Sequence, residues 1–192
     1  MIEDIKYKLN LHNSEKPSGR PQASVLIAIL NYGKYIESPE LIYTQRSRHL
    51  STHSGEVSFP GGKAEEKDAS LFGTALRESN EEISLKSKDV TELGKLNYLI
   101  SRHKIEVNPF VASVDRPQTL KPNEEIQEIF TVPLDFLLDP INIKREIIER
   151  HGGIWQVPTW SIKNQKIWGL TAMITVNFLN VCFDANIEIL EG

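Results

Sequence analysis

Apolar positions in the first part of the chain fall into short runs, which predict strands. The run over 23–31 is continuous and rich in β-branched and aliphatic side chains, as in a strand buried on both faces. Residues 40–46 predict a second strand, and residues 56–59 predict a short third strand that stops at a Pro-Gly-Gly turn over 60–62. Three strands therefore precede the first helical pattern.

The period of the pattern changes at residue 68. From 68 to 85, apolar side chains recur on one stripe and charged side chains on another, which predicts an amphipathic helix. Asp68 stands at the position of an N-cap, and no proline interrupts the run. The glycine turn and the helix thus form a predicted strand–loop–helix unit.

The rest of the chain mixes strands and helices without a regular alternation. Residues 168–181 predict a buried helix, and residues 135–150 are predicted to be partly helical, with a break at Asp139-Pro140. Strands are predicted over 92–100, 104–114, 125–132 and 154–161. This mixture predicts an α/β fold in which a mixed β-sheet is sandwiched between α-helices.

Length and composition narrow the class of protein. The 192 residues suit a single domain, predicted over 23–192 after a polar lead-in over 1–22. A net charge of −4 argues against a general nucleic-acid binder. The chain has no apolar stretch of about 18 residues, as a membrane span needs, and no signal-peptide pattern, so we expect a cytoplasmic protein without a membrane partner. The one cysteine, Cys182, excludes an intrachain disulfide, and its apolar neighbours predict a buried thiol.

Three carboxylates share one face of the predicted helix. Glu78, Glu81 and Glu82 stand at positions i, i+3 and i+4, where like charges repel each other. Residues 61–85 hold six acidic and three basic residues, a local charge of −3. A divalent cation would convert the repulsion into binding, and ligands that are all carboxylate oxygens favour Mg²⁺ or Mn²⁺. The simpler alternative is a solvated acidic face.

The surroundings of the three glutamates resemble a known signature. Arg77 directly precedes them, and the Pro-Gly-Gly turn lies upstream. This combination resembles the Nudix hydrolase signature, in which a glycine and a distant glutamate precede Arg-Glu, an apolar residue, any residue and Glu-Glu. Arg77-Glu78 and Glu81-Glu82 match that pattern.

Three positions depart from the signature. Ser79 replaces an apolar residue, and Ser84 replaces a glycine near the end of the helix. The spacing from Gly62 to Arg77 is one residue longer, so Asp68 stands roughly where the signature has its first glutamate.

Residues 42–62 resemble the coenzyme A pyrophosphatase branch of the Nudix hydrolases, which tolerates the longer spacing. The residues that match the pattern of this branch are Thr44, Arg46, Ser47, Gly55, Phe59, Pro60, Gly61 and Gly62. Residues 108–114, 128–138 and 166–172 are similar to the same branch, so the resemblance covers about residues 23–180.

The resemblance implies roles for the metal site. Glu78 and Glu82 would be the main ligands of Mg²⁺ or Mn²⁺, and Glu81 a third ligand or the general base. Arg77 would hold the loop to the helix through a carboxylate, Asp68 or Glu65, or else contact phosphate directly.

The resemblance also implies a substrate site. Arg46 is the first candidate for a phosphate contact, because a guanidinium binds phosphate through two parallel hydrogen bonds. Ser47, Gly55, Gly61 and Gly62 complete the implied substrate site. Glu125 and Glu128 are alternatives to Glu81 as the base. The tryptophans could stack on a base or fill the core; they are Trp155, Trp160 and Trp168.

The implied activity is hydrolysis of the diphosphate bond of coenzyme A or a derivative, giving 3′,5′-ADP and 4′-phosphopantetheine. Three alternatives stay open at this point. The substrate could be another nucleoside diphosphate derivative, such as ADP-ribose, NADH or a damaged nucleotide. The chain could be a Nudix-like binding module without catalysis, or a plain metal-binding protein. The sequence does not fix the number of metal ions or the oligomeric state.

Overall fold

A large mixed sheet forms the centre of the computed structural model, which describes residues 1–49, 52–150 and 153–191. Five strands follow the order β3-β2-β1-β7-β5, while β4 pairs with β1, β6 with β7 and β8 with β2. The strands are β1 (Gln22–Leu30), β2 (Glu40–Arg46), β3 (Val57–Ser58), β4 (Gly61–Lys63), β5 (Val90–Lys95), β6 (Leu99–Ile100), β7 (Glu106–Val114) and β8 (Ile126–Pro133).

The two central strands run parallel and are buried on both faces. β1 pairs with β7 from Gln22↔Glu106 to Leu30↔Val114, and β1 pairs antiparallel with β2 and β4. All nine residues of β7 are buried. The predicted mixed sheet is therefore confirmed, and the continuous apolar run of β1 follows from its cover on both sides.

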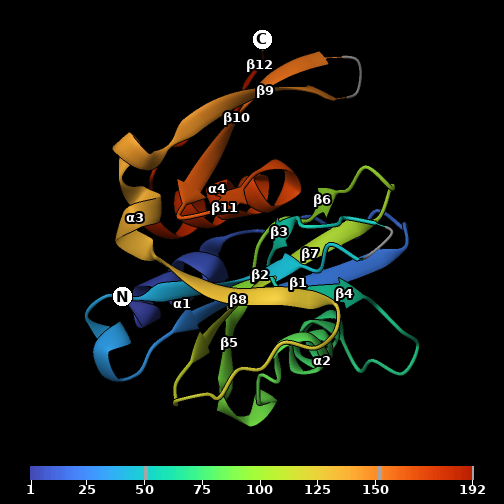
Figure 1. Ribbon diagram of the computed structural model, residues 1–192, viewed down its shortest axis with the longest axis vertical. Helices are drawn as coiled ribbons and strands as arrows, with labels where there is room; N and C mark the ends of the chain where they lie inside the picture. Colours follow the sequence, from blue (N-terminus) through green and yellow to red (C-terminus); the bar gives the residue numbers. More distant parts are fainter. Residues whose placement is uncertain (50–51, 151–152, 192) are drawn as a thin grey trace.

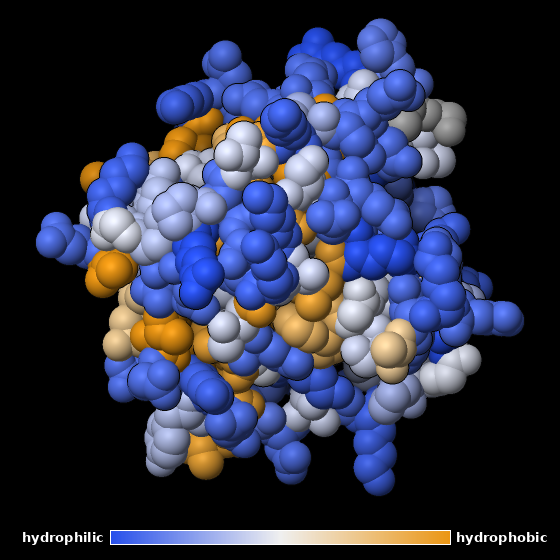
Figure 2. Space-filling view, turned by 90° about the horizontal axis from the view of Figure 1, so that it is seen from below, coloured by the Kyte–Doolittle hydropathy of each residue, from blue (hydrophilic) through white to orange (hydrophobic). Residues whose placement is uncertain are grey.

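Helices cover both faces of this sheet (Figure 1). Leu26 and Ala28 of β1 belong to a cluster with Ala75 and Ile83 of α2 (Leu71–Ile83). Alternate residues of β1 point the other way, into a larger cluster that includes side chains of α1 (Ile2–Leu11) and α4 (Gly169–Phe183). Seen from below, over α2, the surface is mainly hydrophilic with scattered apolar patches (Figure 2).

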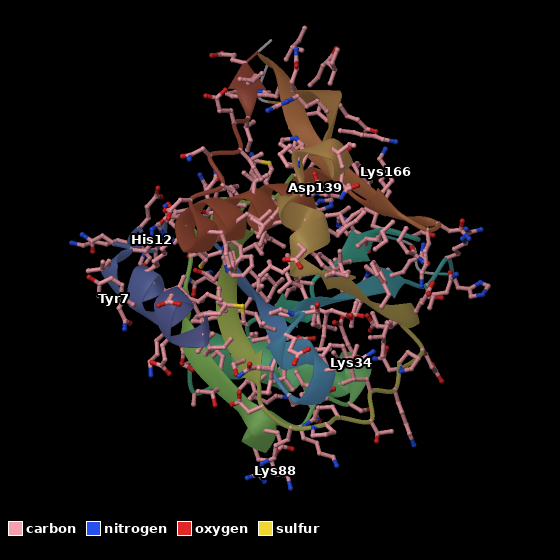
Figure 3. All side chains as sticks on the ribbon, turned by 90° about the vertical axis from the view of Figure 1, so that its left-hand side faces the viewer. Tyr7, His12, Lys34, Lys88, Asp139 and Lys166 are labelled. Atoms are coloured by element: carbon pink, nitrogen blue, oxygen red, sulfur yellow. The ribbon has the colours of Figure 1, made fainter. Side chains whose placement is uncertain are left out.

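Part of the predicted polar lead-in is the helix α1. Its Ile5 and Leu9 are buried, whereas Tyr7 points away from the body (Figure 3). Gly94 of β5 makes room for this helix, because a Cβ there would lie 2.8 Å from Cβ of Leu9. The sequence pattern did not predict α1, because only two positions of this helix are buried. The division into lead-in and domain stays a prediction.

The helical prediction for 135–150 is wrong over its second half. Helix α3 (Leu134–Leu138) and a 3₁₀ turn (Pro140–Asn142) are followed by strand β9 (Lys144–Arg150). Exposure alternates with a period of two from 145 to 149, which is the pattern of a strand with one covered face. β9 belongs to a second sheet with β10 (Gly153–Ile162), β11 (Gln165–Ile167) and β12 (Leu190–Glu191).

Two other predictions hold with changed bounds. The strand predicted over 92–100 consists of two pieces, β5 and β6, and the helix predicted over 168–181 is α4.

Among the helices of the described ranges, none is long and apolar enough to cross a membrane.

Candidate active site

The glycine turn lies directly against β1 and α2. Gly61 has φ 153°, and a Cβ there would meet the Ser24 carbonyl oxygen and lie 2.6 Å from Cα of Val25. At Gly62 a Cβ would lie 2.5 Å from one carboxylate oxygen of Glu78 and 2.6 Å from the other. The absence of a side chain at Gly61 thus lets the turn lie against the backbone of β1, and its absence at Gly62 leaves room for the Glu78 carboxylate of α2.

Helix α2 begins at a different cap from the one the sequence predicted. Ser70 is the N-cap, and its hydroxyl oxygen accepts a hydrogen bond from the Gly73 backbone N–H at 3.0 Å. The prediction of Asp68 as N-cap is therefore wrong. Asp68 lies two residues before Ser70, and its carboxylate accepts hydrogen bonds from the Glu65 backbone N–H and from Oγ1 of Thr74, both at 2.9 Å.

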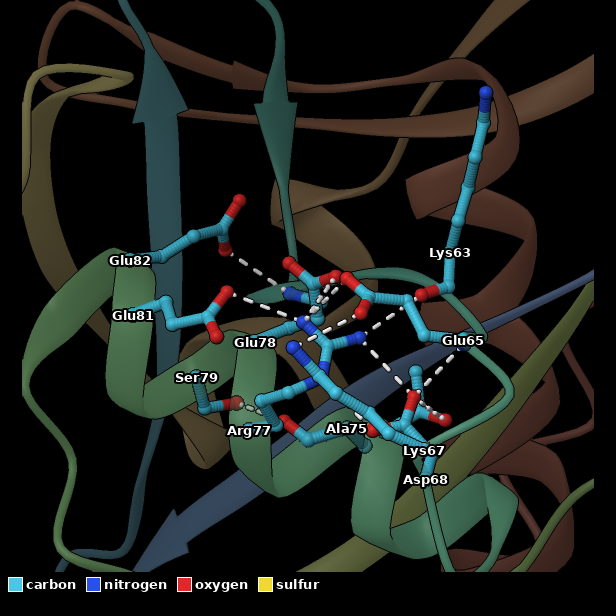
Figure 4. A network of polar contacts seen from close by, with 12 residues as sticks. Lys63, Glu65, Lys67, Asp68, Ala75, Arg77, Glu78, Ser79, Glu81 and Glu82 are labelled. Atoms are coloured by element: carbon cyan, nitrogen blue, oxygen red, sulfur yellow. Dashed lines mark hydrogen bonds and ion pairs between the residues drawn. The ribbon is translucent and has the colours of Figure 1, made fainter.

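Asp68 instead pairs with Arg77 (Figure 4). Nε of Arg77 donates to Oδ1 at 2.8 Å and Nη2 donates to Oδ2 at 3.1 Å, a bidentate contact. Nη2 also donates to the Lys63 carbonyl oxygen at 3.0 Å, so Arg77 joins the loop to the helix. The hydrogen bonds from Arg77 hold the pKa of Asp68 well below its usual range. Glu65, the other expected partner, lies at 3.5 Å from Nη1.

Each of the three helix carboxylates has a partner in the structure, and two of them share Arg77. Nη1 of Arg77 donates to Oε1 of Glu78 at 3.0 Å and to Oε2 of Glu81 at 3.1 Å. Oε2 of Glu82 accepts the Gly61 backbone N–H at 3.0 Å. Glu82 is buried, Glu78 is partly buried and Glu81 is half exposed. Arg77 and the turn thus offset the repulsion that the spacing of the carboxylates creates.

Burial shifts the pKa of two of these carboxylates. It raises the pKa of Glu82 to about 7, although the Gly61 N–H and Arg46 act in the opposite direction. Burial also raises the pKa of Glu78. An additional positive charge near the two groups would favour their ionised forms. Sites of catalysis commonly hold such shifted carboxylates.

The chemistry of these side chains fits a hard divalent cation. The donors are carboxylate oxygens, two of them in an environment that penalises an uncompensated negative charge. Within the described residues, no three His, Cys, Asp or Glu side chains already converge on one point as a metal site. Glu78 and Glu81 would exchange Arg77 for the cation.

Arg46 connects this cluster with the start of β8. Its Nη1 lies 3.5 Å from Oε1 of Glu82, and its Nη2 donates to Oε2 of Glu125 at 3.2 Å. Nε of Arg46 is buried and has no hydrogen-bond partner among the described residues. An unsatisfied buried donor is costly, and an anionic oxygen would satisfy it.

Two more of the predicted substrate residues, Ser47 and Gly55, lie between β2 and β3. Ser47 is buried, and its backbone N–H donates to the Glu125 carbonyl at 2.7 Å. Gly55 has φ 70°, and its carbonyl accepts a hydrogen bond from Nε2 of Gln45 at 3.3 Å. These bonds hold Ser47 to the start of β8 and Gly55 to β2.

The candidate bases differ in their surroundings. Glu81 pairs with Arg77, and Glu125 joins the cluster through Arg46. Glu128 is held by Nε2 of Gln165 at 2.5 Å, and Nε2 also donates to Gln45. Gln165 was not among the residues predicted from the sequence, because a single polar residue in a short strand forms no recognisable pattern.

The departures from the signature have local explanations. Ser79 is buried, and its hydroxyl donates to the Ala75 carbonyl at 2.6 Å, so the polar group is satisfied within the helix. Ser84 ends the helix with φ 59°, the left-handed conformation that glycine adopts most easily. Both serines therefore leave the geometry of the helix in place.

Two predictions outside the site also have an outcome. Trp160 is buried, and its Nε1 donates to the Leu137 carbonyl at 3.1 Å, which makes it a core residue. Trp168 is partly exposed at the start of α4. Cys182 is buried as predicted, and burial raises the pKa of its thiol to about 12.

Comparisons with known proteins agree with this architecture. The NUDIX domain family matches residues 20–151. The chain is 37% identical over 176 residues to "Uncharacterized Nudix hydrolase NudL" of Pectobacterium atrosepticum, which covers 88% of this chain and 87% of that protein. A protein of the same name from Yersinia pestis is 40% identical over 154 residues, covering 80% of this chain and 75% of that protein.

A solved structure shows the same fold. A MutT/nudix family protein from Enterococcus faecalis aligns with a TM-score of 0.54 at 13% identity, covering 96% of this chain and 70% of that chain. At that identity the likeness concerns the fold alone.

Proposed function

Because this chain belongs to the Nudix hydrolase family, we propose that its carboxylate site hydrolyses the diphosphate bond of coenzyme A or a derivative. The products are 3′,5′-ADP and 4′-phosphopantetheine or its derivative. The choice of substrate rests on residues 42–62, which resemble the coenzyme A pyrophosphatase branch, and the cofactor is Mg²⁺ or Mn²⁺.

One observation supports the proposal most strongly. Arg46, from the segment that resembles the coenzyme A branch, lies 3.5 Å from Glu82 of the carboxylate helix and has an unsatisfied buried Nε. The segment that resembles the coenzyme A branch and the helix that resembles the Nudix signature therefore meet at one site. A cation and a phosphate-binding guanidinium could act there on the same diphosphate.

Some of the side chains bind the cation or the substrate, and another accepts a proton. Glu78 and Glu82 hold the cation, which when bound neutralises charge on the diphosphate and lowers the pKa of a water molecule. Arg46 binds a phosphate oxygen through its guanidinium. Glu81 takes the proton of the attacking water, with Glu125 as the alternative base. Arg77 positions the helix against the loop through Asp68, which keeps Glu78 and Glu82 in place.

A substrate panel tests the proposal. The purified protein is incubated with Mg²⁺ or Mn²⁺ and with coenzyme A, an acylated coenzyme A, ADP-ribose or NADH, and the products are separated by chromatography. We expect cleavage of coenzyme A or its acyl derivative. Cleavage of ADP-ribose or NADH with coenzyme A untouched would reassign the substrate. No turnover of any of these compounds would favour a binding module.

A pair of variants tests the metal ligands. Glu82→Gln removes a charge at a buried position, and we expect loss of metal-dependent turnover. Glu66→Gln, an exposed position in the same segment, serves as the control and should behave like the wild type. Equal turnover by Glu82→Gln and the wild type would show that Glu82 is not a metal ligand.

A further inference from the structure

The strand β9 lies at a free edge of the second sheet. It forms a hairpin with β10 that rises away from the eight-stranded sheet (Figure 1). Within the described residues, β9 pairs with β10 and with no other strand. Its outer edge therefore presents backbone N–H and C=O groups, which are a template for pairing with another strand. None of the candidate active-site residues lies on β9.

One face of this edge is exposed and partly apolar. Arg145, Ile147 and Glu149 point to the exposed face, and Ile147 is 72% exposed. Ile147 lies opposite Gln156 of β10, which in turn lies opposite Leu190 of β12. Leu190 is 37% exposed, so an apolar side chain stands on each outer strand of this face.

The opposite face of β9 is already used within the chain. Oε1 of Glu146 pairs with Nζ of Lys166 of β11 at 2.6 Å, and Lys166 is labelled in Figure 3. Ile148 is partly buried and lies opposite Trp155 of β10. The exposed face and the free edge are therefore the parts of β9 available to a partner.

We propose that β9 pairs antiparallel with β9 of a second copy of this chain, with Ile147 on the two-fold axis. In a strand, every second residue directs its N–H and C=O groups to the same edge. Two residues that lie opposite each other in an antiparallel pair both direct these groups toward the partner strand or both away from it. An odd-numbered residue of β9 must therefore lie opposite an odd-numbered residue of the second copy, and an even-numbered residue opposite an even-numbered one. The axis then passes through a residue and its own copy. Within Arg145–Glu149, the candidates near the middle are Glu146, Ile147 and Ile148.

Charge complementarity favours Ile147 as the position of the two-fold axis. With the axis there, Arg145 of each copy faces Glu149 of the other, and the two Ile147 side chains meet between these pairs. Opposite charges and apolar side chains directly across an antiparallel pair are stabilising. With the axis at Glu146, two glutamates would face each other, and with the axis at Ile148, Ile147 would face a glutamate. The sequence of β9 thus favours its own copy in one register.

The size of the contact sets its strength. Two short strand segments bury less than the roughly 1,200 Å² that stable interfaces need at minimum, so the dimer is weak and depends on concentration.

Arg145 can still pair with Glu149 of the second copy. Its Nη1 donates to the Glu188 carbonyl at 2.7 Å, and the guanidinium has further donors for the second contact.

Sedimentation velocity of the full chain over a wide range of concentration tests the proposal. We expect the wild type to shift from monomer to dimer as the concentration rises. Ile147→Lys places two like charges at the axis and should abolish the dimer. Ile141→Lys is the matched control, because Ile141 is an exposed isoleucine outside β9. Circular dichroism shows whether each variant is folded.

Charge reversal tests the register. Glu149→Arg places Arg145 against an arginine and should abolish the dimer, whereas the double variant Arg145→Glu/Glu149→Arg should restore it. A wild type that stays monomeric throughout overturns the proposal, as does a dimer that Ile147→Lys leaves intact. A folded double variant that stays monomeric overturns the register. Since β9 lies outside the candidate active site, hydrolysis by the monomeric variants should equal that of the wild type.

Discussion

Replacing Gly62 with alanine would displace Glu78 without straining the backbone. The new Cβ would lie 2.5 Å from a carboxylate oxygen of Glu78, whereas ordinary van der Waals contact begins at 3.4 Å. Cδ of Glu78 would lie closer still, so the carboxylate must retreat by at least 0.9 Å, the difference between the two distances. The end of a glutamate side chain can move that far, so we expect the fold to survive.

The activity should not survive unchanged. Misplacement of a catalytic group by about 1 Å can cost about 100-fold in rate. We therefore expect Gly62→Ala to lower kcat/KM for the diphosphate substrate by about that factor and to raise the concentration of Mg²⁺ needed for half-maximal activity. The assay is steady-state hydrolysis at several Mg²⁺ concentrations, together with thermal unfolding.

Two other glycines provide the controls. Gly73→Ala lies within α2, where the nearest atom would be 3.4 Å away, so activity should stay and stability should rise by about 0.5–1 kcal/mol. Gly61→Ala meets backbone atoms at φ 153° and should unfold the protein. Wild-type kcat/KM and Mg²⁺ dependence in a folded Gly62→Ala variant would refute the placement of Glu78 as a ligand held against the turn.

Three further predictions follow from single side chains. Arg46→Lys keeps the charge but loses the forked contact with Glu82 and Glu125, so KM for the diphosphate substrate should rise roughly tenfold or more in steady-state kinetics. Burial acts to raise the pKa of Glu106, but hydrogen bonds from Ser18, Asn108 and Gln22 outweigh it and the net pKa is lowered. Glu106 therefore stabilises the fold above the ordinary pKa of 4.5, and this contribution is lost as the pH falls through the lower folded value. Glu106→Gln should reduce the free energy of unfolding by about 1–3 kcal/mol at neutral pH and flatten its acid dependence in urea titrations. The Cys182 thiol has a pKa of about 12, so it should resist thiol reagents at pH near 8 in the folded protein and react after unfolding, as read by mass spectrometry.

The sequence predicted the parts of the fold that depend on strong local patterns. β1 is a continuous apolar run because α2 covers one of its faces and α4 the other. The stretch over 144–150 has no such signal, since two adjacent isoleucines fit a helix as well as a strand. Its pairing with β10, a contact between different segments, makes it a strand.

In the candidate site, too, local patterns could be predicted from the sequence, whereas contacts between distant segments could not. The spacing of Glu78, Glu81 and Glu82 on one helical face could be derived from the sequence. The role of Asp68 could not, because Asp is equally suited to an N-cap and to a contact with arginine. The choice depends on the loop, which presents Ser70 to the first turn and leaves Asp68 to Arg77. The contact between Arg46 and Glu82 joins strands and helices far apart in the chain.

The charge balance around the helix favours a cation at this site. Arg77 is shared by four carboxylates, those of Glu65, Asp68, Glu78 and Glu81, and Arg46 is shared by Glu82 and Glu125. Two guanidinium groups thus face six carboxylates, and the raised pKa of Glu82, about 7, reflects burial that the nearby positive charge does not offset. A divalent cation would supply the missing positive charge where burial makes it most effective. Mg²⁺ should therefore raise the midpoint of thermal unfolding of the wild type and have a smaller effect on Glu82→Gln.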